Sequence, residues 1–310
     1  MSRNRKGVPI HGWLNIDKPQ GLTSNQVLGR VRRALNAQKL GHAGTLDPLA
    51  TGVLPIALGE ATKTISFAQD RDKVYRFTIT WGEERDTDDS EGAITATSSR
   101  RPTAAEITAL IPRFIGDIEQ TPPQFSAIKV DGARAYDLAR AGEDIALQSR
   151  MVSVYDLRLL STTPVTAELE LECGKGTYVR AIARDLGRIL GCLGHVSSLR
   201  RMAVGSFSEE NAIPLDEFEK MVLSSATDRY LMPVETVLDD IPALALTDSE
   251  ISRIKQGQTI RLLSRQDIDR LDKAGIDGTT GLILAIGNNQ PLALLTREGI
   301  DLHPVRLFNL

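Results

Sequence analysis

Cysteine and histidine are scarce in this sequence. Its 310 residues include only two cysteines and four histidines. The spacing of Cys173 and Cys192 matches neither a redox pair nor a metal-binding motif. We therefore expect both to act as small buried side chains in a reducing compartment. The histidines are scattered along the chain, so the sequence predicts no metal site.

Long apolar segments are also missing. No apolar run approaches the ~20 residues that a membrane-spanning helix needs. The basic start of the chain, Met1 to Lys6, is not followed by the apolar core of a secretory signal. We therefore expect a cytoplasmic protein that does not act at a membrane.

The glycine-rich motifs of common cofactor-binding sites are absent. Gly174-Lys175 lacks both the upstream glycine and the following Ser or Thr of a phosphate-binding loop. No Gly-x-Gly-x-x-Gly lies between a predicted strand and helix. Neither cysteine is in an activating loop, and the scattered histidines do not fit a zinc deaminase. The sequence thus gives no support for these cofactor-dependent, thiolate or zinc chemistries.

The chain is long enough for two domains. A length of 310 residues exceeds a typical single domain, and 41% hydrophobic and 25% charged residues are ordinary for a globular protein. After about residue 235, short strands separated by turns predominate. We predict an α+β fold, with a mixed sheet flanked by helices in residues 1–235 and a small β-rich module in residues 236–310.

The net charge of −3 hides a strong asymmetry along the chain. Residues 1–42 hold eight Lys or Arg and one acidic residue, and residues 175–201 hold six and one. Residues 83–92 instead hold six acidic residues and one Arg. If the two basic segments meet in the fold, they form a focused nucleic-acid-binding patch. The equally weighted alternative is that each segment is a solvated helix face.

Periodicity indicates which faces of the main elements are buried. Residues 74–81 alternate as a half-buried strand that includes Tyr75, and residues 152–160 and 166–173 resemble an antiparallel strand pair. An amphipathic helix follows over about residues 178–190. On this helix Arg180, Arg184 and Arg188 repeat every four residues and form one basic ridge.

One carboxylate lies in a glycine-rich segment that has no clear period. Asp47 precedes Pro48, which favours an extended backbone at the aspartate. Loops held by a rigid scaffold often carry catalytic groups. Taken alone, however, Asp-Pro is a common turn, and His42 would simply fill the loop. By the same reasoning, Tyr75 alone is an ordinary core tyrosine, and Arg180 alone is an exposed helix residue.

Five stretches of the sequence, taken in order, connect these residues to one another. They are Leu14-Asn15-Ile16-Asp17-Lys18-Pro19-Gln20-Gly21-Leu22-Thr23-Ser24, Gly41 to Lys63, Ser126-Ala127-Ile128-Lys129, Gly176-Thr177-Tyr178-Val179-Arg180 and Ser198-Leu199-Arg200-Arg201. Together the five stretches resemble the TruB-type tRNA pseudouridine-55 synthases. The resemblance implies a largely antiparallel pseudouridine synthase core, and the C-terminal module is similar to a PUA-type RNA-binding domain in size and strand pattern.

The implied reaction converts uridine 55 in the T-loop of tRNA to pseudouridine. The N1–C1′ bond breaks, the uracil rotates, and C5 bonds to C1′, so no cofactor is required. The partner implied is the T-arm of tRNA, without a guide RNA, and we expect a monomer. We also expect the two basic segments to converge on the backbone of the T-arm.

The resemblance also assigns roles to individual residues. It implies that Asp47 is the catalytic carboxylate, that Arg180 pairs with it, and that Tyr75 stacks on the target base. It places Tyr178 in the active site as well. The residues expected to bind or enclose the substrate are His42, Lys18, Lys129, Leu199 and Arg201.

Three questions stay open at this stage. The chain could instead be an RNA-binding or tRNA-folding factor without chemistry, or have such a folding role in addition. It could also be a guide-dependent pseudouridylase subunit. Finally, the sequence does not distinguish whether Asp47 attacks the ribose, attacks the uracil ring or removes a ribose proton.

Overall fold

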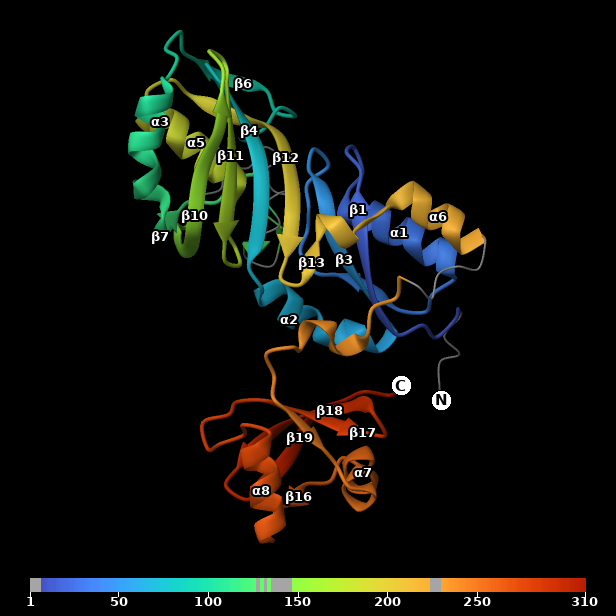
Figure 1. Cartoon of the computed structure of the whole chain (residues 1–310). Helices are drawn as coiled ribbons and strands as arrows, with labels where there is room; N and C mark the ends of the chain where they lie inside the picture. The colour runs from blue at the N-terminus through green and yellow to red at the C-terminus, as the bar shows by residue number, and fades with distance from the viewer. Residues whose placement is uncertain (1–6, 127–128, 131–132, 135–146, 224–229) are drawn as a thin grey trace.

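The computed structural model describes residues 7–126, 129–130, 133–134, 147–223 and 230–310. In this part of the chain, a ten-stranded sheet is followed by a separate five-stranded sheet (Figure 1). The predicted α+β fold, with a mixed sheet and a β-rich C-terminal module, is therefore confirmed. Among the described residues, no helix is long and apolar enough to cross a membrane.

The large sheet is mostly antiparallel. Its main strands, in spatial order, are β14 (Ile213–Pro214), β1 (Gly12–Lys18), β3 (Thr51–Leu58), β12 (Gly194–Val204), β4 (Lys73–Trp81), β11 (Thr166–Cys173), β10 (Arg150–Thr162) and β7 (Gly116–Gln120). In addition, β2 (Leu40–His42) pairs with β3, and β13 (Phe207–Ser208) pairs with β12. Only the pairs β1–β14 and β3–β12 are parallel.

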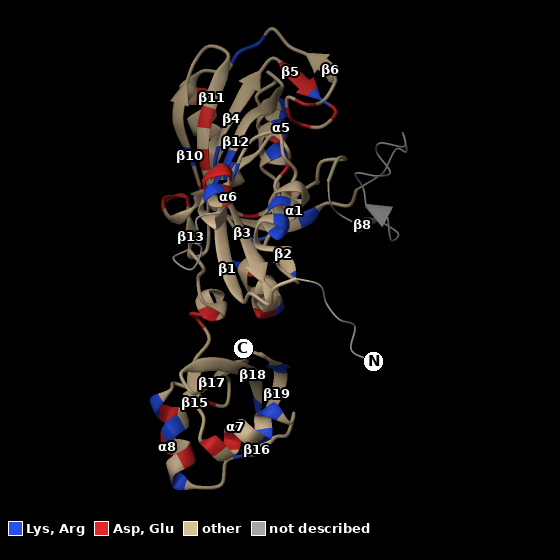
Figure 2. Ribbon diagram, turned by 90° about the vertical axis from the view of Figure 1, so that its right-hand side faces the viewer, with Lys and Arg blue, Asp and Glu red and all other residues tan. Residues whose placement is uncertain are grey.

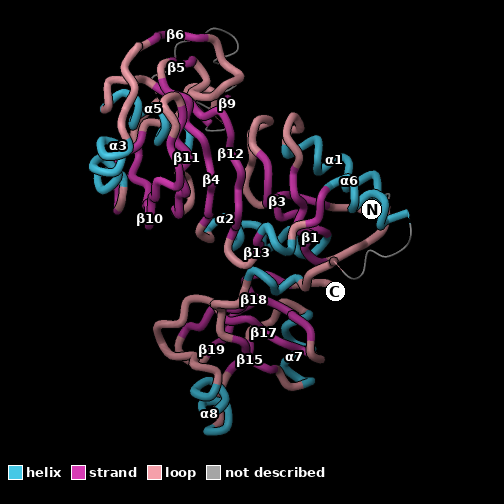
Figure 3. Tube along the Cα trace, turned by 45° about the horizontal axis from the view of Figure 1, so that its top comes forward, coloured by secondary structure: helices cyan, strands magenta, loops and turns pink. Residues whose placement is uncertain are grey.

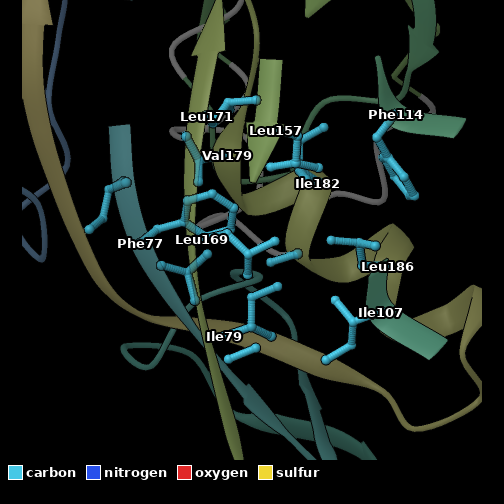
Figure 4. Close-up of a cluster of buried hydrophobic side chains, with 14 of the residues drawn as sticks. Phe77, Ile79, Ile107, Phe114, Leu157, Leu169, Leu171, Val179, Ile182 and Leu186 are labelled. Carbon is cyan, nitrogen blue, oxygen red and sulfur yellow. The ribbon is translucent and has the colours of Figure 1, made fainter. Parts of the chain in front are cut away.

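One half of this sheet, from β12 to β7, carries helices on one face. These are α5 (Val179–Ile189), α3 (Ala104–Leu110) and the 3-10 turn η2 (Ile111–Phe114). Figure 4 shows Phe77 and Leu169 of the sheet packed against Ile182 and Leu186 of α5. Each fully buried side chain of this kind contributes about 1.5–3 kcal/mol. The alternation of side chains expected in residues 74–81 places alternate side chains of β4 in this core.

The other half of the sheet packs against α1 (Ser24–Leu35) and α6 (Leu215–Leu223). Thr23 caps α1 by accepting a hydrogen bond from the Gln26 N–H, while the Gln26 side chain accepts one from the Thr23 N–H. Val27 and Val31 lie on the buried face of α1. A helix with a firm start and one apolar face is thereby fixed against the sheet.

The C-terminal sheet has the order β15 (Ala243–Ala245), β17 (Ile283–Gly287), β18 (Gln290–Glu298), β19 (Asp301–Leu307) and β16 (Ile260–Arg261), with helices α7 (Asp248–Lys255) and α8 (Arg265–Lys273). Figure 3 shows this sheet beyond the end of the large one. The two share a hydrophobic cluster, in which Trp13 and Val53 join Leu294 and Phe308. The domain boundary expected after residue 235 falls within the short helix η5 (Val234–Val237) and stays a prediction.

The remaining elements are short. They are η1 (Gly59–Thr64), α2 (Ile65–Asp70), β5 (Glu83–Arg85), β6 (Ile94–Thr97), β8 (Lys129–Val130), β9 (Ala133–Arg134) and η3 (Glu209–Asn211). Among them β5 pairs with β6 and β8 with β9, both antiparallel, and β5 forms the first part of the acidic segment. At η1, the Lys63 ammonium donates to the Leu307 carbonyl over 2.6 Å, and Glu60 accepts from the Asn309 N–H over 2.9 Å. These bonds hold the end of the chain against the large sheet's domain.

The two halves of the large sheet meet at a narrow seam. Strands β3 and β12 share only two registered pairs, Arg200 with Thr51 and Arg201 with Gly52. Gly52 has φ +99°, and a Cβ atom there would lie 2.2 Å from the Arg201 carbonyl oxygen. The seam thus depends on a glycine, both for its backbone conformation and for the close approach of the two strands.

Replacing Gly52 by alanine should destabilise the protein by more than about 2 kcal/mol, because the new methyl group meets backbone and φ is unfavourable. Urea unfolding measures the change. Gly278→Ala is the matched control, since a Cβ at Gly278 meets nothing within 4 Å and its φ is ordinary. Equal stability of the two variants would contradict this view of the seam.

The buried His195 predicts how stability depends on pH. Its Nδ1 lies 3.1 Å from the Glu83 carbonyl oxygen, and burial lowers its pKa. As the pH falls below about 6.5, the unfolded chain binds a proton at this residue that the folded protein excludes, so the free energy of unfolding falls, by up to about 1.4 kcal/mol per pH unit. Urea unfolding at pH 7.5 and 5.5 should show a smaller loss for His195→Gln than for the wild type. An equal loss would rule out this contribution.

Candidate active site

A cavity of about 610 Å³ opens at the seam between the two halves of the large sheet. It is lined by the loop before β3, by β4, β10 and β12, and by the segment that leads into α5. Six residues predicted from the sequence line it: Asp47, Tyr75, Tyr178, Arg180, Leu199 and Arg201. Segments far apart in the sequence therefore bring these side chains to one place.

The Asp47 loop is held by its neighbours on both sides. Leu46 and Leu49 are buried in the core, and the Ala50 N–H donates to the Asp47 carbonyl oxygen over 3.1 Å. Pro48 limits the backbone at Asp47. The Asp47 side chain itself is 39% exposed, so this carboxylate faces the cavity from a rigid loop.

Arg180 is buried at the first turn of α5 and contacts carboxylates from two separate segments of the chain. Its Nη2 lies 3.1 Å from Asp47 Oδ2, and its Nη1 lies 3.5 Å from Asp89 Oδ2. The guanidinium also donates to the carbonyl oxygens of Thr87 and Phe125, over 2.6 and 2.8 Å. A planar guanidinium with several donors suits such a fixed set of acceptors. Asp89 thus shares Arg180 with Asp47.

Tyr178 is fixed by a residue that no sequence pattern indicated. The buried side-chain amide of Gln120 donates to the Tyr178 carbonyl over 3.1 Å and accepts from its N–H over 2.8 Å. The Arg150 guanidinium lies over the Tyr178 ring, 5.0 Å from its centre, and donates to the Gly176 carbonyl. Arg150 lines the cavity, and no carboxylate among the described residues pairs with it.

Tyr75 and Arg201 face each other across β4 and β12. Burial raises the pKa of Tyr75, although a hydrogen bond from Arg201 acts in the opposite direction. Tyr75 is therefore a neutral phenol at neutral pH. Arg201 is fully buried and donates to the carbonyl oxygens of Val53 and Gly44, so it links β12 to the Asp47 loop and to β3.

Two of the predicted substrate-binding residues, His42 and Lys18, are not among the described residues that line the cavity. His42 lies at the end of β2, where burial, and to a lesser degree Arg201, lowers its pKa. Lys18 is completely buried, and burial lowers its pKa to about 8 in spite of nearby Asp47. Its ammonium donates hydrogen bonds to the carbonyl oxygens of Pro19 and Leu22 and is not exposed at the surface. Lys129 begins β8, but its side chain lies outside the described residues.

Each arginine of the basic ridge predicted on α5 lies near a carboxylate in the structure, and binding of RNA by this ridge stays a prediction. Arg184 is buried and lies 3.0 Å from Asp88, and Arg188 pairs with Glu84. With the Arg180–Asp89 contact, each arginine of the ridge meets a carboxylate of the acidic segment. Figure 2 shows the acidic hairpin region beside the basic residues of α5. Burial raises the pKa of Asp88 to about 6 despite Arg184.

Two further polar residues lie within the family stretches but were given no role from the sequence. Ser126 lines the cavity, is buried, and its hydroxyl has no hydrogen-bond partner among the described residues. Ser24, at the start of α1, bonds to the backbone of Leu46. In the described residues, no group of three or more His, Cys, Asp or Glu side chains is arranged to hold a metal ion.

Comparisons of sequence place this arrangement in a family. Residues 32–179 match the model described as TruB family pseudouridylate synthase (N terminal domain), and residues 180–239 match the tRNA pseudouridylate synthase B C-terminal domain. The chain is 52% identical over 311 residues to the tRNA pseudouridine synthase B of Caulobacter vibrioides, with both chains fully covered. It is 48% identical over 314 residues to that of Rhodospirillum rubrum, again with full coverage of both.

Solved structures share the fold at low sequence identity. A Cbf5-Nop10-Gar1 complex contains a chain that matches 96% of this one and 85% of its own length, with a TM-score of 0.71 and 24% identity. An H/ACA RNP bound to a substrate RNA containing 2'-deoxyuridine contains a chain that matches 100% of this one and 92% of its own length, with a TM-score of 0.70 and 21% identity. The fold, the cavity and the full-length relatives agree: this chain belongs to the TruB family of pseudouridylate synthases.

Proposed function

We propose that the protein isomerises uridine 55 in the T-loop of tRNA to pseudouridine, with Asp47 as the catalytic carboxylate. The N1–C1′ bond breaks, the uracil turns, C5 bonds to C1′, the C5 proton leaves and N1 gains a proton. The single observation that carries the proposal is the Asp47–Arg180 ion pair, which faces a cavity beside Tyr75. The names of the bacterial relatives support tRNA as the substrate.

The cavity suits one nucleotide that has left its base stack. Its volume of about 610 Å³ lies in the usual range for a small-molecule site. Flipping a base out costs a few kcal/mol, and stacking on an aromatic side chain offsets part of that cost. We assign this stacking to Tyr75, which as a neutral phenol is a poor base. A bound nucleotide would also supply the partner that the Ser126 hydroxyl lacks.

We further propose that the protein acts without a guide RNA, as a monomer, in the cytoplasm where tRNA is modified. The support is the full-length identity of about 50% to proteins named tRNA pseudouridine synthase B. Identity to the chains of the H/ACA complexes is only 21–24%. Turnover of a naked T-arm stem-loop by the purified chain tests this directly, and a strict need for added guide RNA would overturn it.

Asp47→Asn should reduce turnover to background and leave RNA binding within about threefold of the wild type, because the change removes the charge but keeps the shape. Tritium release from T-arm RNA labelled at uridine C5 measures turnover. Asp70→Asn is the matched control, since Asp70 also lines the cavity but pairs with the exposed Lys175. Full activity of the Asp47 variant would refute the role of this carboxylate.

Arg150, which lines the cavity and pairs with no carboxylate among the described residues, should contact the RNA backbone. Arg150→Gln should weaken T-arm binding and reduce the slope of log K against log salt by about 0.7–0.9, the value for one lost phosphate contact. Arg188→Gln should leave the slope unchanged, because Arg188 is already paired with Glu84. Binding titrations at several salt concentrations measure both slopes. The opposite ranking of the two variants would show that the α5 ridge, and not Arg150, meets the phosphates.

A further inference from the structure

Few direct contacts fix the position of the Asp47 carboxylate. Arg180 Nη2, at 3.1 Å, is the only ion-pair partner of Asp47 among the described residues. The side chain is 39% exposed, so packing does not fix it either. Its position must therefore be set by the backbone of residues 46–48, and the groups that hold this backbone act on the site through it.

Ser24 holds the peptide groups on the N-terminal side of Asp47. The Ser24 hydroxyl donates to the Leu46 carbonyl oxygen over 3.0 Å and accepts from the Leu46 N–H over 2.8 Å. Both bonds are buried, and Ser24 is only 2% exposed. Since one hydroxyl satisfies a donor and an acceptor of the same residue, it fixes both the position and the orientation of Leu46.

The C-terminal side of Asp47 is held by the same short segment. The Pro48 carbonyl oxygen accepts from the Gly21 N–H over 2.8 Å and from the Lys18 ammonium over 3.4 Å. Residues 18–24 thus form hydrogen bonds to the loop on both sides of the aspartate. Their own position is secured because α1, which begins at Ser24, buries Val27 and Val31 against the sheet.

We propose that Ser24 is a positioning residue for Asp47, which it holds toward Arg180 and the cavity through the backbone of Leu46. The inference rests on the proposed catalytic role of Asp47. Without the hydroxyl, the N–H and C=O of Leu46 lose a buried partner, and the loop shifts to find others. A displacement of about 1 Å in a catalytic group can cost roughly 100-fold in rate. Ground-state binding of RNA does not need this precision.

The test compares four variants by single-turnover rate and by RNA affinity, with thermal melting to check folding. Ser24→Ala removes the hydroxyl, and Ser24→Cys nearly preserves the volume but bonds weakly. Both should lose rate by about 10–100-fold while Kd changes by less than about threefold. Ser24→Thr, which restores a hydroxyl, should recover most of the rate that Ser24→Ala loses.

Thr23→Ala is the matched control. It removes the cap of the same helix, one residue away, but Thr23 makes no bond to the Asp47 loop. It should melt at a lower temperature and keep a rate within about threefold of the wild type. A rate loss equal to that of Ser24→Ala, or a Ser24→Cys protein with the wild-type rate, would overturn the proposal. Turnover by Asp47→Asn would instead refute the role of Asp47, so the two failures are distinguishable.

Discussion

The structure depends on the buried guanidinium of Arg180. It joins a loop from one half of the large sheet, which carries Asp47, to the acidic segment of the other half, which carries Asp89. A buried charge is tolerated only when it is paired and hydrogen-bonded, and removing one partner of such a pair commonly costs about 3–5 kcal/mol. The group that orients the proposed catalytic carboxylate is therefore also one that holds the two halves together, so chemistry and stability are not separable at this residue.

Charge compensation around α5 explains why an acidic protein is compatible with an RNA substrate. The segment of residues 83–92 contributes Glu84, Asp88 and Asp89 to the three arginines of the helix. These carboxylates balance the charges of the three arginines. Arg150, which lies over the Tyr178 ring and lines the cavity, pairs with no carboxylate among the described residues. Counting charges along the sequence locates such groups but does not show which of them are already neutralised.

Local patterns were sufficient for much of the fold. The alternation of residues 74–81, the strand pair that includes Leu169 and the helix after Tyr178 were all predicted correctly, because each is set by side chains close together in sequence. The family motifs pointed to most of the residues that line the cavity. Gln120 and Arg150 could not be found in this way, and Ser24, although it ends the first family stretch, was given no role. Their roles come from contacts with backbone groups distant in the chain, for which no residue type or spacing is diagnostic.

The seam between β3 and β12 also determines when the cavity can exist. The bond from Arg201 to the Val53 carbonyl joins residues 148 positions apart. Closing so long a loop is entropically costly and slow compared with forming the adjacent strands β1 and β3. At about 5–20 residues per second, a ribosome adds the intervening chain in roughly 7–30 s. Until residue 180 has been added Asp47 lacks Arg180, and until residue 201 has been added the cavity is incomplete, so the nascent chain carries the Asp47 loop motif before it has a site in which to use it.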